Sequence, residues 1–153
     1  MSRRLLSALV LACMAMAAGT LAYTASATVP TNKLYTMMTG AQEVPGPGDA
    51  NARGIALLNV RPASGEVCVN VRFSRIDGTL SGMHIHEGKR GVAGPIVINL
   101  TAALSNNGVG CGAASAATIS ALRMNPRRFY LNVHSEPAFG GGAIRGQLFD
   151  SDL

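Results

Sequence analysis

Short apolar segments alternate with turn residues along most of the chain, which is the pattern of an all-β protein. The clearest example is segment 66–73, where apolar and polar side chains strictly alternate. Its apolar positions are Val67, Val69, Val71 and Phe73. Because side chains alternate between the two faces of a strand, this segment predicts a half-buried antiparallel strand.

The segment before this strand predicts its hairpin partner. Residues 62–65 read Pro-Ala-Ser-Gly, a composition typical of a turn, and residues 53–60 before them are mostly apolar. We expect a strand over 53–60 with Ile55 and Leu57 on its buried face and with Leu58 as a further buried candidate.

The rest of the chain predicts more short strands and one helix. The other strands are expected over 34–39, 80–86, 95–100, 129–134 and 143–149. Segment 115–125 predicts the helix, because Ser115 is a suitable cap and Pro126 stops the pattern. The polar, glycine-rich stretches 105–114 and 135–142 are predicted loops. The expected fold is an all-β Greek-key sandwich or small barrel of about seven or eight antiparallel strands.

The N-terminus predicts a secretory signal peptide over residues 1–27. Arg3 and Arg4 precede an uncharged apolar stretch, and Ala-Ser-Ala at 25–27 is a small-residue cleavage motif. Two alternatives stay open: an uncleaved anchor helix over 5–22, and a lipoprotein acylated at Cys13. Cleavage would leave a short tail at 28–33 and one domain at 34–153, secreted or periplasmic, with no membrane span.

Composition and charge exclude several protein classes. The chain has 153 residues, 48% of them apolar and 14% charged, so a disordered chain is excluded. Its formal charge is +5. Loss of Arg3 and Arg4 would leave 11 basic against 8 acidic residues, or +3. An excess this mild does not predict a nucleic-acid partner.

The cysteines predict one disulfide. The chain has three, and removal of Cys13 with the signal peptide leaves Cys68 and Cys111. Two cysteines in an exported domain favour a bond between them, which would close a loop of roughly 43 residues. The alternative is two separate buried thiols.

Five ordered motifs resemble the successive blocks of the CHRD domain. They are TGAQEVP at 39–45, HIHEG at 84–88, GPIV at 94–97, FYLNVHS at 129–135 and GAIRGQL at 142–148. The resemblance implies an extracytoplasmic β-sandwich that acts as a binding or structural module. Its partner would be an extracytoplasmic protein or small ligand that the sequence does not identify. Within these motifs, Glu43, Asn132 and Arg145 are candidates for a buried structural network.

All three histidines of the chain lie within these motifs. His84 and His86 share one strand face, and His134 lies on another strand. Three imidazoles suit a copper or zinc ion, and in that case their rings should converge within about 5 Å. The alternative is structural: the histidines bond to backbone groups or to Glu87, and polar neighbours lock the strand register.

The same residues carry a fainter similarity to copper–zinc superoxide dismutases. His84-x-His86, Val133-His134 and Arg145 occur here in the order of that family's copper ligands and anion-guiding arginine. This similarity implies a copper site, an anion bound by Arg145 and, for an enzyme, a metal-dependent oxidoreductase. No histidine lies between His86 and His134, so the bridging imidazole and the zinc loop are absent. The sequence assigns no catalytic residue.

Overall fold

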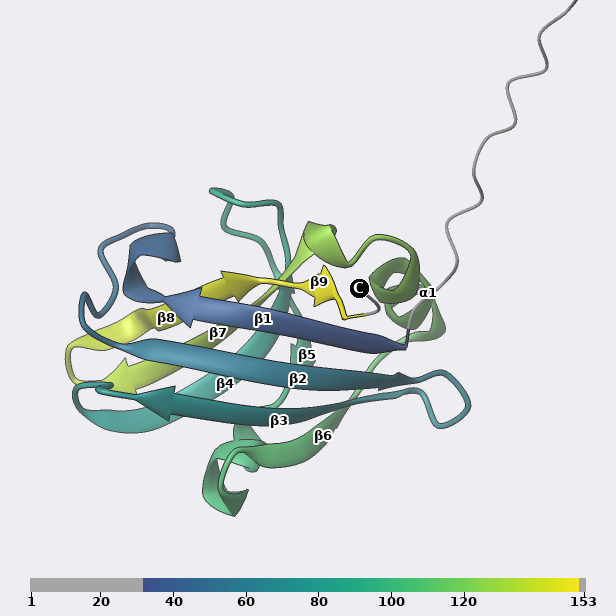
Figure 1. The fold of residues 1–153 in the computed structure, drawn as a ribbon, viewed down its shortest axis with the longest axis horizontal. Coiled ribbons are helices and arrows are strands. Elements are labelled where there is room, and N and C mark those ends of the chain that lie inside the picture. Colours follow the sequence, from purple (N-terminus) through teal and green to yellow (C-terminus); the bar gives the residue numbers. More distant parts are fainter. Residues whose placement is uncertain (1–31, 152–153) are drawn as a thin grey trace, which may run out of the picture.

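Nine antiparallel strands form one curved sheet in the computed structural model, which describes residues 32–151. The strands are β1 (Lys33–Thr39), β2 (Arg53–Arg61), β3 (Glu66–Ser74), β4 (Thr79–Glu87), β5 (Ile96–Asn99), β6 (Val109–Ala113), β7 (Phe129–Glu136), β8 (Phe139–Gln147) and β9 (Phe149–Asp150). Their order is β5-β4-β7-β8-β1-β2-β3-β6, with β9 beside β1 (Figure 1). The expected signal peptide at 1–27 and the tail as far as residue 31 lie outside the described residues.

The sheet curves until its two edges almost meet. An added Cβ at Gly112 of β6 would collide with the carbonyl oxygen of Asn99 at the end of β5. In Figure 1, β1, β2 and β3 lie in front of β4 and β7. The interior holds one continuous apolar cluster, with Val67, Met83 and Val133 among its members. The predicted all-β, barrel-like fold with one short helix is therefore confirmed.

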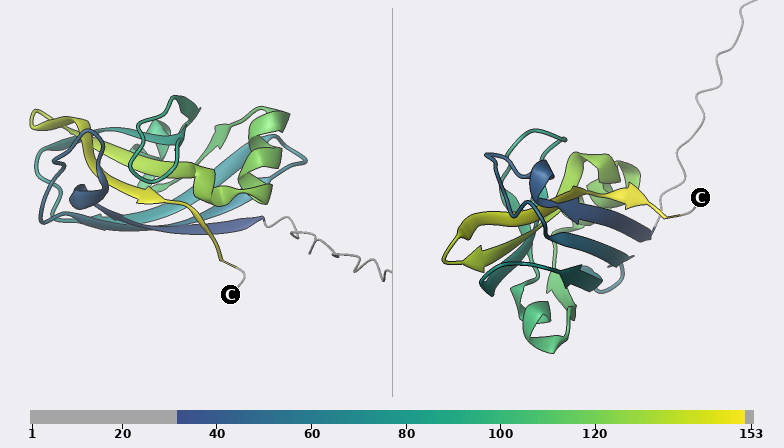
Figure 2. Two further views of the ribbon diagram at one scale, coloured as in Figure 1. Left: turned by 90° about the horizontal axis from the view of Figure 1, so that it is seen from above. Right: turned by 60° about the vertical axis from the view of Figure 1, so that its left-hand side comes forward.

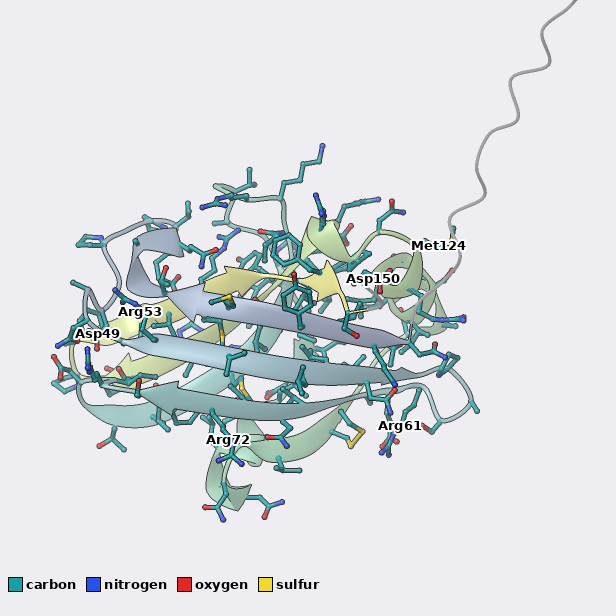
Figure 3. All side chains as sticks on the ribbon, viewed as in Figure 1. Asp49, Arg53, Arg61, Arg72, Met124 and Asp150 are labelled. Atoms are coloured by element: carbon teal, nitrogen blue, oxygen red, sulfur yellow. A yellow bond between two sulfur atoms is a disulfide. The ribbon has the colours of Figure 1, made fainter. Side chains whose placement is uncertain are left out.

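The predicted buried face of β2 is wrong. Ile55 is 51% exposed and Leu57 is 60% exposed, whereas Leu58 is 3% exposed. The reason is the register with β3. Leu57 lies opposite Asn70 on the outward side, whereas Leu58 lies opposite Val69 in the core. Arg72, the cross-strand partner of Ile55, lies on this outward side and is labelled in Figure 3.

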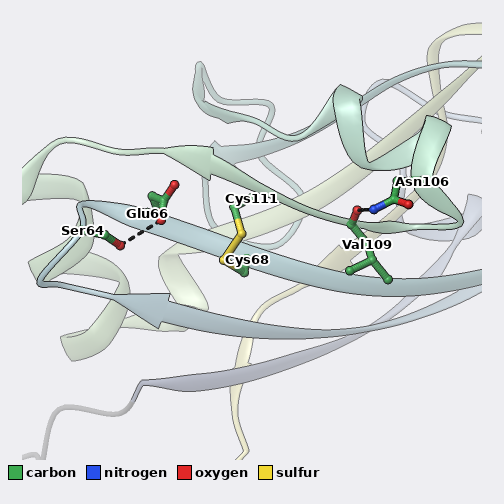
Figure 4. The surroundings of a disulfide bond; sticks show 6 residues. All are labelled: Ser64, Glu66, Cys68, Asn106, Val109 and Cys111. Carbon is green, nitrogen blue, oxygen red and sulfur yellow. Dashed lines mark hydrogen bonds between the residues drawn. A yellow bond between two sulfur atoms is a disulfide. The ribbon is translucent and has the colours of Figure 1, made fainter.

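The glycine-rich stretch 105–114 is not the loop that its composition predicts. It contains strand β6, which pairs with β3 and places Cys111 directly opposite Cys68. The two cysteines form the predicted disulfide (Figure 4). At one end of β6, Asn106 Nδ2 donates a hydrogen bond to the Val109 carbonyl at 2.9 Å. Glycines lower strand propensity, but here they let β6 lie close to β5.

The predicted helix is present as α1 (Ala116–Met124), which lies at one end of the barrel (Figure 1). The Ser115 side chain caps it by accepting a hydrogen bond from the Thr118 backbone N–H at 3.1 Å. Ile119 and Leu122 point into the core. The short 3₁₀ segments are η1 (Gly40–Gln42), η2 (Thr101–Asn106) and η3 (Pro126–Arg128). Within residues 32–151, no helix has the length and apolar character needed to cross a membrane.

Strands β4, β7 and β8 place a polar face on the outside of the barrel. Met83 and Ile85 point into the core, so their neighbours His84 and His86 point outward, as predicted. The β4–β5 loop, residues 88–95, lies on this outer side of the barrel (Figure 2). Strand β7 runs to Glu136 and β8 begins at Phe139, so most of the predicted loop 135–142 is strand.

Candidate metal centre

The three histidines meet on the outer face of β4 and β7. Gly82 lies opposite His134 in the register, and His84 lies opposite Asn132. The ring centroids of His84 and His86 are 5.9 Å apart, and those of His84 and His134 are 5.1 Å apart. One ring nitrogen from each histidine lies within 4.8 Å of those of the other two. The structure thus brings all three residues of the predicted metal site together.

The tautomer of His86 follows from its backbone contact. His86 Nδ1 lies 2.9 Å from the carbonyl oxygen of Gly94 in the β4–β5 loop. A carbonyl oxygen only accepts hydrogen bonds, so the proton of the neutral ring sits on Nδ1. The lone pair is then on Nε2, which is shielded from solvent and has no hydrogen-bond partner.

His134 has the same tautomer for a different structural reason. Its Nδ1 lies 2.9 Å from the carbonyl oxygen of Gly140. Val133 pairs with Ile144 but Ser135 pairs with Phe139, so His134 alone faces residues 140–143 of β8. This irregularity turns the glycine-rich segment toward the ring. The Nε2 atom of His134 is again buried without a partner.

In His84 the two ring nitrogens have the reverse roles: Nε2 makes the contact, and Nδ1 is the nitrogen without a partner. Its Nε2 lies 3.5 Å from Thr101 Oγ1, and that hydroxyl oxygen also accepts a hydrogen bond from the Met83 backbone N–H at 3.2 Å. The Nδ1 atom of His84 is buried and has no partner. A metal ion on Nδ1 would leave the Nε2–H directed at Thr101.

The three unpartnered nitrogens are the chemically informative feature of the site. Buried polar atoms are normally hydrogen-bonded, and an unpaired one costs about 1–3 kcal/mol. Here Nδ1 of His84 and Nε2 of His86 and His134 all lack partners. Ligating histidines characteristically donate their other ring N–H to a carbonyl or side chain, as these do. Nitrogens bound to one ion at about 2.0–2.1 Å lie roughly 3–4 Å apart, within reach of small ring rotations.

Burial keeps two of the rings neutral. Desolvation lowers the pKa of His84, and the nearby His134 and His86 lower it further. Desolvation also lowers the pKa of His86, partly opposed by the hydrogen bond to Gly94. Metal ligation requires the neutral imidazole, so these environments favour ligation at neutral pH.

Glu43, Asn132 and Arg145 lie beside the histidines and are all buried. Glu43 Oε1 accepts a hydrogen bond from Asn132 Nδ2 at 2.6 Å. Burial raises the pKa of Glu43 to about 7, although Arg145 acts in the opposite direction. Arg145 directs its Nη2 to backbone carbonyls of the β4–β5 loop, and its Nη1 has no hydrogen-bond partner. The anion-binding role of Arg145 stays a prediction.

Some contributors to the site carry almost no signal in the sequence. Gly94 and Gly140 act through backbone carbonyls, and Thr101 reaches His84 only because η2 returns to β4. Glu87, a suggested partner of the histidines, instead pairs with Arg128 at 2.6 Å. The glycine run at 140–142 was the one available clue, because such a run allows the irregular pairing opposite His134.

Comparison with protein families gives one match. The family model described as the CHRD domain matches residues 34–148. Among curated proteins and among solved structures, none matches the chain. The matched range contains every residue of the site described above.

Proposed function

The chain belongs to the CHRD-domain family, and we propose that it is an exported binding module that holds one copper or zinc ion on His84, His86 and His134. Family membership supports a structural or binding module. The metal is our assignment of what that module binds. Export rests on the sequence pattern at residues 1–27.

One observation carries the proposal. One ring nitrogen of each histidine lies within 4.8 Å of those of the other two. Each ring has one nitrogen without a hydrogen-bond partner and is oriented by a contact at its opposite nitrogen. A network that only locked the strand register would be expected to satisfy these atoms. A single ion would satisfy all three together.

The donor set determines which ions fit. Three neutral imidazoles suit copper and zinc, whereas magnesium and calcium prefer oxygen ligands. A three-histidine set leaves a coordination position for water or another small ligand. Thr101, Gly94 and Gly140 would act as the outer shell that fixes the rings.

Metal titration of the tag-free protein tests the proposal. After removal of metal with a chelator, Cu²⁺ or Zn²⁺ should bind the wild type with about one equivalent. The His84→Ala/His86→Ala variant should lose this uptake, whereas Asn70→Ala, on the exposed face of β3, should retain it. Absence of uptake by the folded wild type, or equal uptake by the histidine variant, would overturn the proposal.

A further inference from the structure

Three planar side chains are stacked in a row beside the site. The rings of His86 and Tyr130 are 4.7 Å apart at an interplanar angle of 11°, so they lie face to face. The guanidinium carbon of Arg145 lies 3.4 Å from the centroid of the Tyr130 ring. Arg145 is 2% exposed and Tyr130 is 4% exposed, so the contact between these two side chains is shielded from water. Cation–π contacts are strongest in such desolvated positions.

The same side chains hold the β4–β5 loop. Arg145 Nη2 donates hydrogen bonds to the carbonyls of Lys89 at 3.0 Å and Val92 at 2.9 Å. The Tyr130 hydroxyl accepts a hydrogen bond from the Gly94 N–H at 3.1 Å. The carbonyl of that same Gly94 accepts from His86 Nδ1. Arg145 therefore reaches His86 along two routes, through the Tyr130 ring and through the loop backbone.

We propose that Arg145 is a positioning residue, which fixes His86 as the Nδ1–H tautomer by clamping the β4–β5 loop and covering Tyr130. The inference deepens the proposed function, since the Nε2 lone pair of that tautomer is the one offered to the metal. This role of Arg145 does not require a bound anion.

The cost of burying the guanidinium supports this role. A buried charge requires compensation, and two loop carbonyls, the Tyr130 ring and the nearby Glu43 provide it. Without Arg145, the carbonyls of Lys89 and Val92 lose their side-chain donor. The loop would then no longer hold the Gly94 carbonyl in a fixed place opposite His86.

The metal-free protein allows a direct test by NMR of the imidazole nitrogens. Two-bond ¹H–¹⁵N correlation at pH 8 distinguishes the two neutral tautomers, and the chain has only three histidines to assign. In the wild type we expect His86 to be almost entirely Nδ1–H. In Arg145→Met we expect the ratio of the Nδ1–H to the Nε2–H tautomer of His86 to fall at least fivefold. His134 is an internal control, because its partner Gly140 lies outside the loop.

A pair of substitutions at Tyr130 covers the case in which Arg145→Met does not fold. Tyr130→Phe keeps the stacked ring but removes the hydroxyl that holds Gly94, so it should weaken the preference of His86 for the Nδ1–H tautomer less than Tyr130→Leu, which removes both. Zinc affinity should fall about 10- to 100-fold in Arg145→Met and Tyr130→Leu, as for other outer-shell losses. Arg72→Met, which removes an exposed arginine from β3, should change neither readout.

Separate outcomes decide the two proposals. An unchanged His86 tautomer in folded Arg145→Met and Tyr130→Leu would overturn the positioning role, even if the wild type binds zinc. A tautomer that changes as expected supports the positioning role, even in a wild type that binds no zinc, and only the metal proposal then fails.

Discussion

Gly82 faces His134 across the β4–β7 pair, and the missing side chain of Gly82 leaves the space in which the histidine rings meet. An added Cβ at Gly82 would lie 3.0 Å from His84 Cε1 and 3.4 Å from His134 Cδ2. The contact with His84 is closer than an ordinary van der Waals contact and the contact with His134 is at its lower limit, so a side chain here would press against the His84 ring.

Gly82→Ala should therefore weaken zinc binding by about tenfold, or 1.4 kcal/mol, with little change in the fold. Gly141→Ala is the matched control, because an added Cβ there meets no atom within 4 Å. Competition titration with a chelating dye measures both affinities. Equal affinities in the two variants would show that the rings do not need this space.

Glu43 should make stability depend on pH. Burial raises its pKa in the folded protein from 4.5 to about 7. Folding thus favours the protonated form, and its stabilising contribution is complete below pH 4.5 and is lost as the pH rises through about 7. Ionised Glu43 should destabilise the protein at pH 8 by on the order of 1–3 kcal/mol.

Glu43→Gln keeps an acceptor for Asn132 and removes the titration. Urea unfolding at intervals between pH 5 and 8 should show the variant gaining stability relative to the wild type as pH rises. Both proteins keep the three histidines, so any pH dependence that the histidines cause cancels in the difference. Parallel curves would mean that Glu43 is already ionised at the lower pH.

The disulfide should stabilise the domain by reducing the number of conformations open to the unfolded chain. Cys68 and Cys111 are 43 residues apart, and a loop of that length is worth about 4 kcal/mol in the chain-entropy model. Cys68→Ser should lower the free energy of unfolding by some 2–5 kcal/mol under oxidising conditions. The wild type with reductant should approach the variant. The same midpoint for both proteins, with and without reductant, would contradict this prediction.

Two neighbouring leucines of β2 test the register with β3. Leu58→Ala removes a core side chain and should cost about 2–5 kcal/mol of unfolding free energy. Leu57→Ala changes an exposed side chain and should stay within about 0.5 kcal/mol. Chemical denaturation of the two variants checks this. A larger loss of unfolding free energy in Leu57→Ala than in Leu58→Ala would contradict this register and would place Leu57 in the core, as the strand pattern alone predicts.

The sequence predicts the strands where one face is clearly apolar. Strand β3 alternates unambiguously, and β4 places His84 and His86 opposite Met83 and Ile85. Strand β2 is apolar on both faces, so its orientation is decided by pairing with β3 rather than by its own pattern. Strand β6 is not predicted by strand propensity, because glycines disfavour strands. Its Gly112 is needed instead for the close approach of β5.

The candidate site was predictable as a set of residues and not as an arrangement. Histidine is rare in this chain, so its three positions stand out. Their convergence depends on β7 pairing with β4, although β5, β6 and α1 separate the two strands in the sequence. The contacts to Gly94 and Gly140 come from the backbone, which no side-chain pattern reports.

Anomalous diffraction from crystals of the zinc- or copper-loaded protein tests the central claim most directly. Data recorded at the absorption edge of the metal should show one dominant peak at about 2.0–2.1 Å from Nδ1 of His84 and Nε2 of His86 and His134. A peak elsewhere, or no peak in protein crystallised with excess metal, would contradict the assignment of these histidines as the metal site.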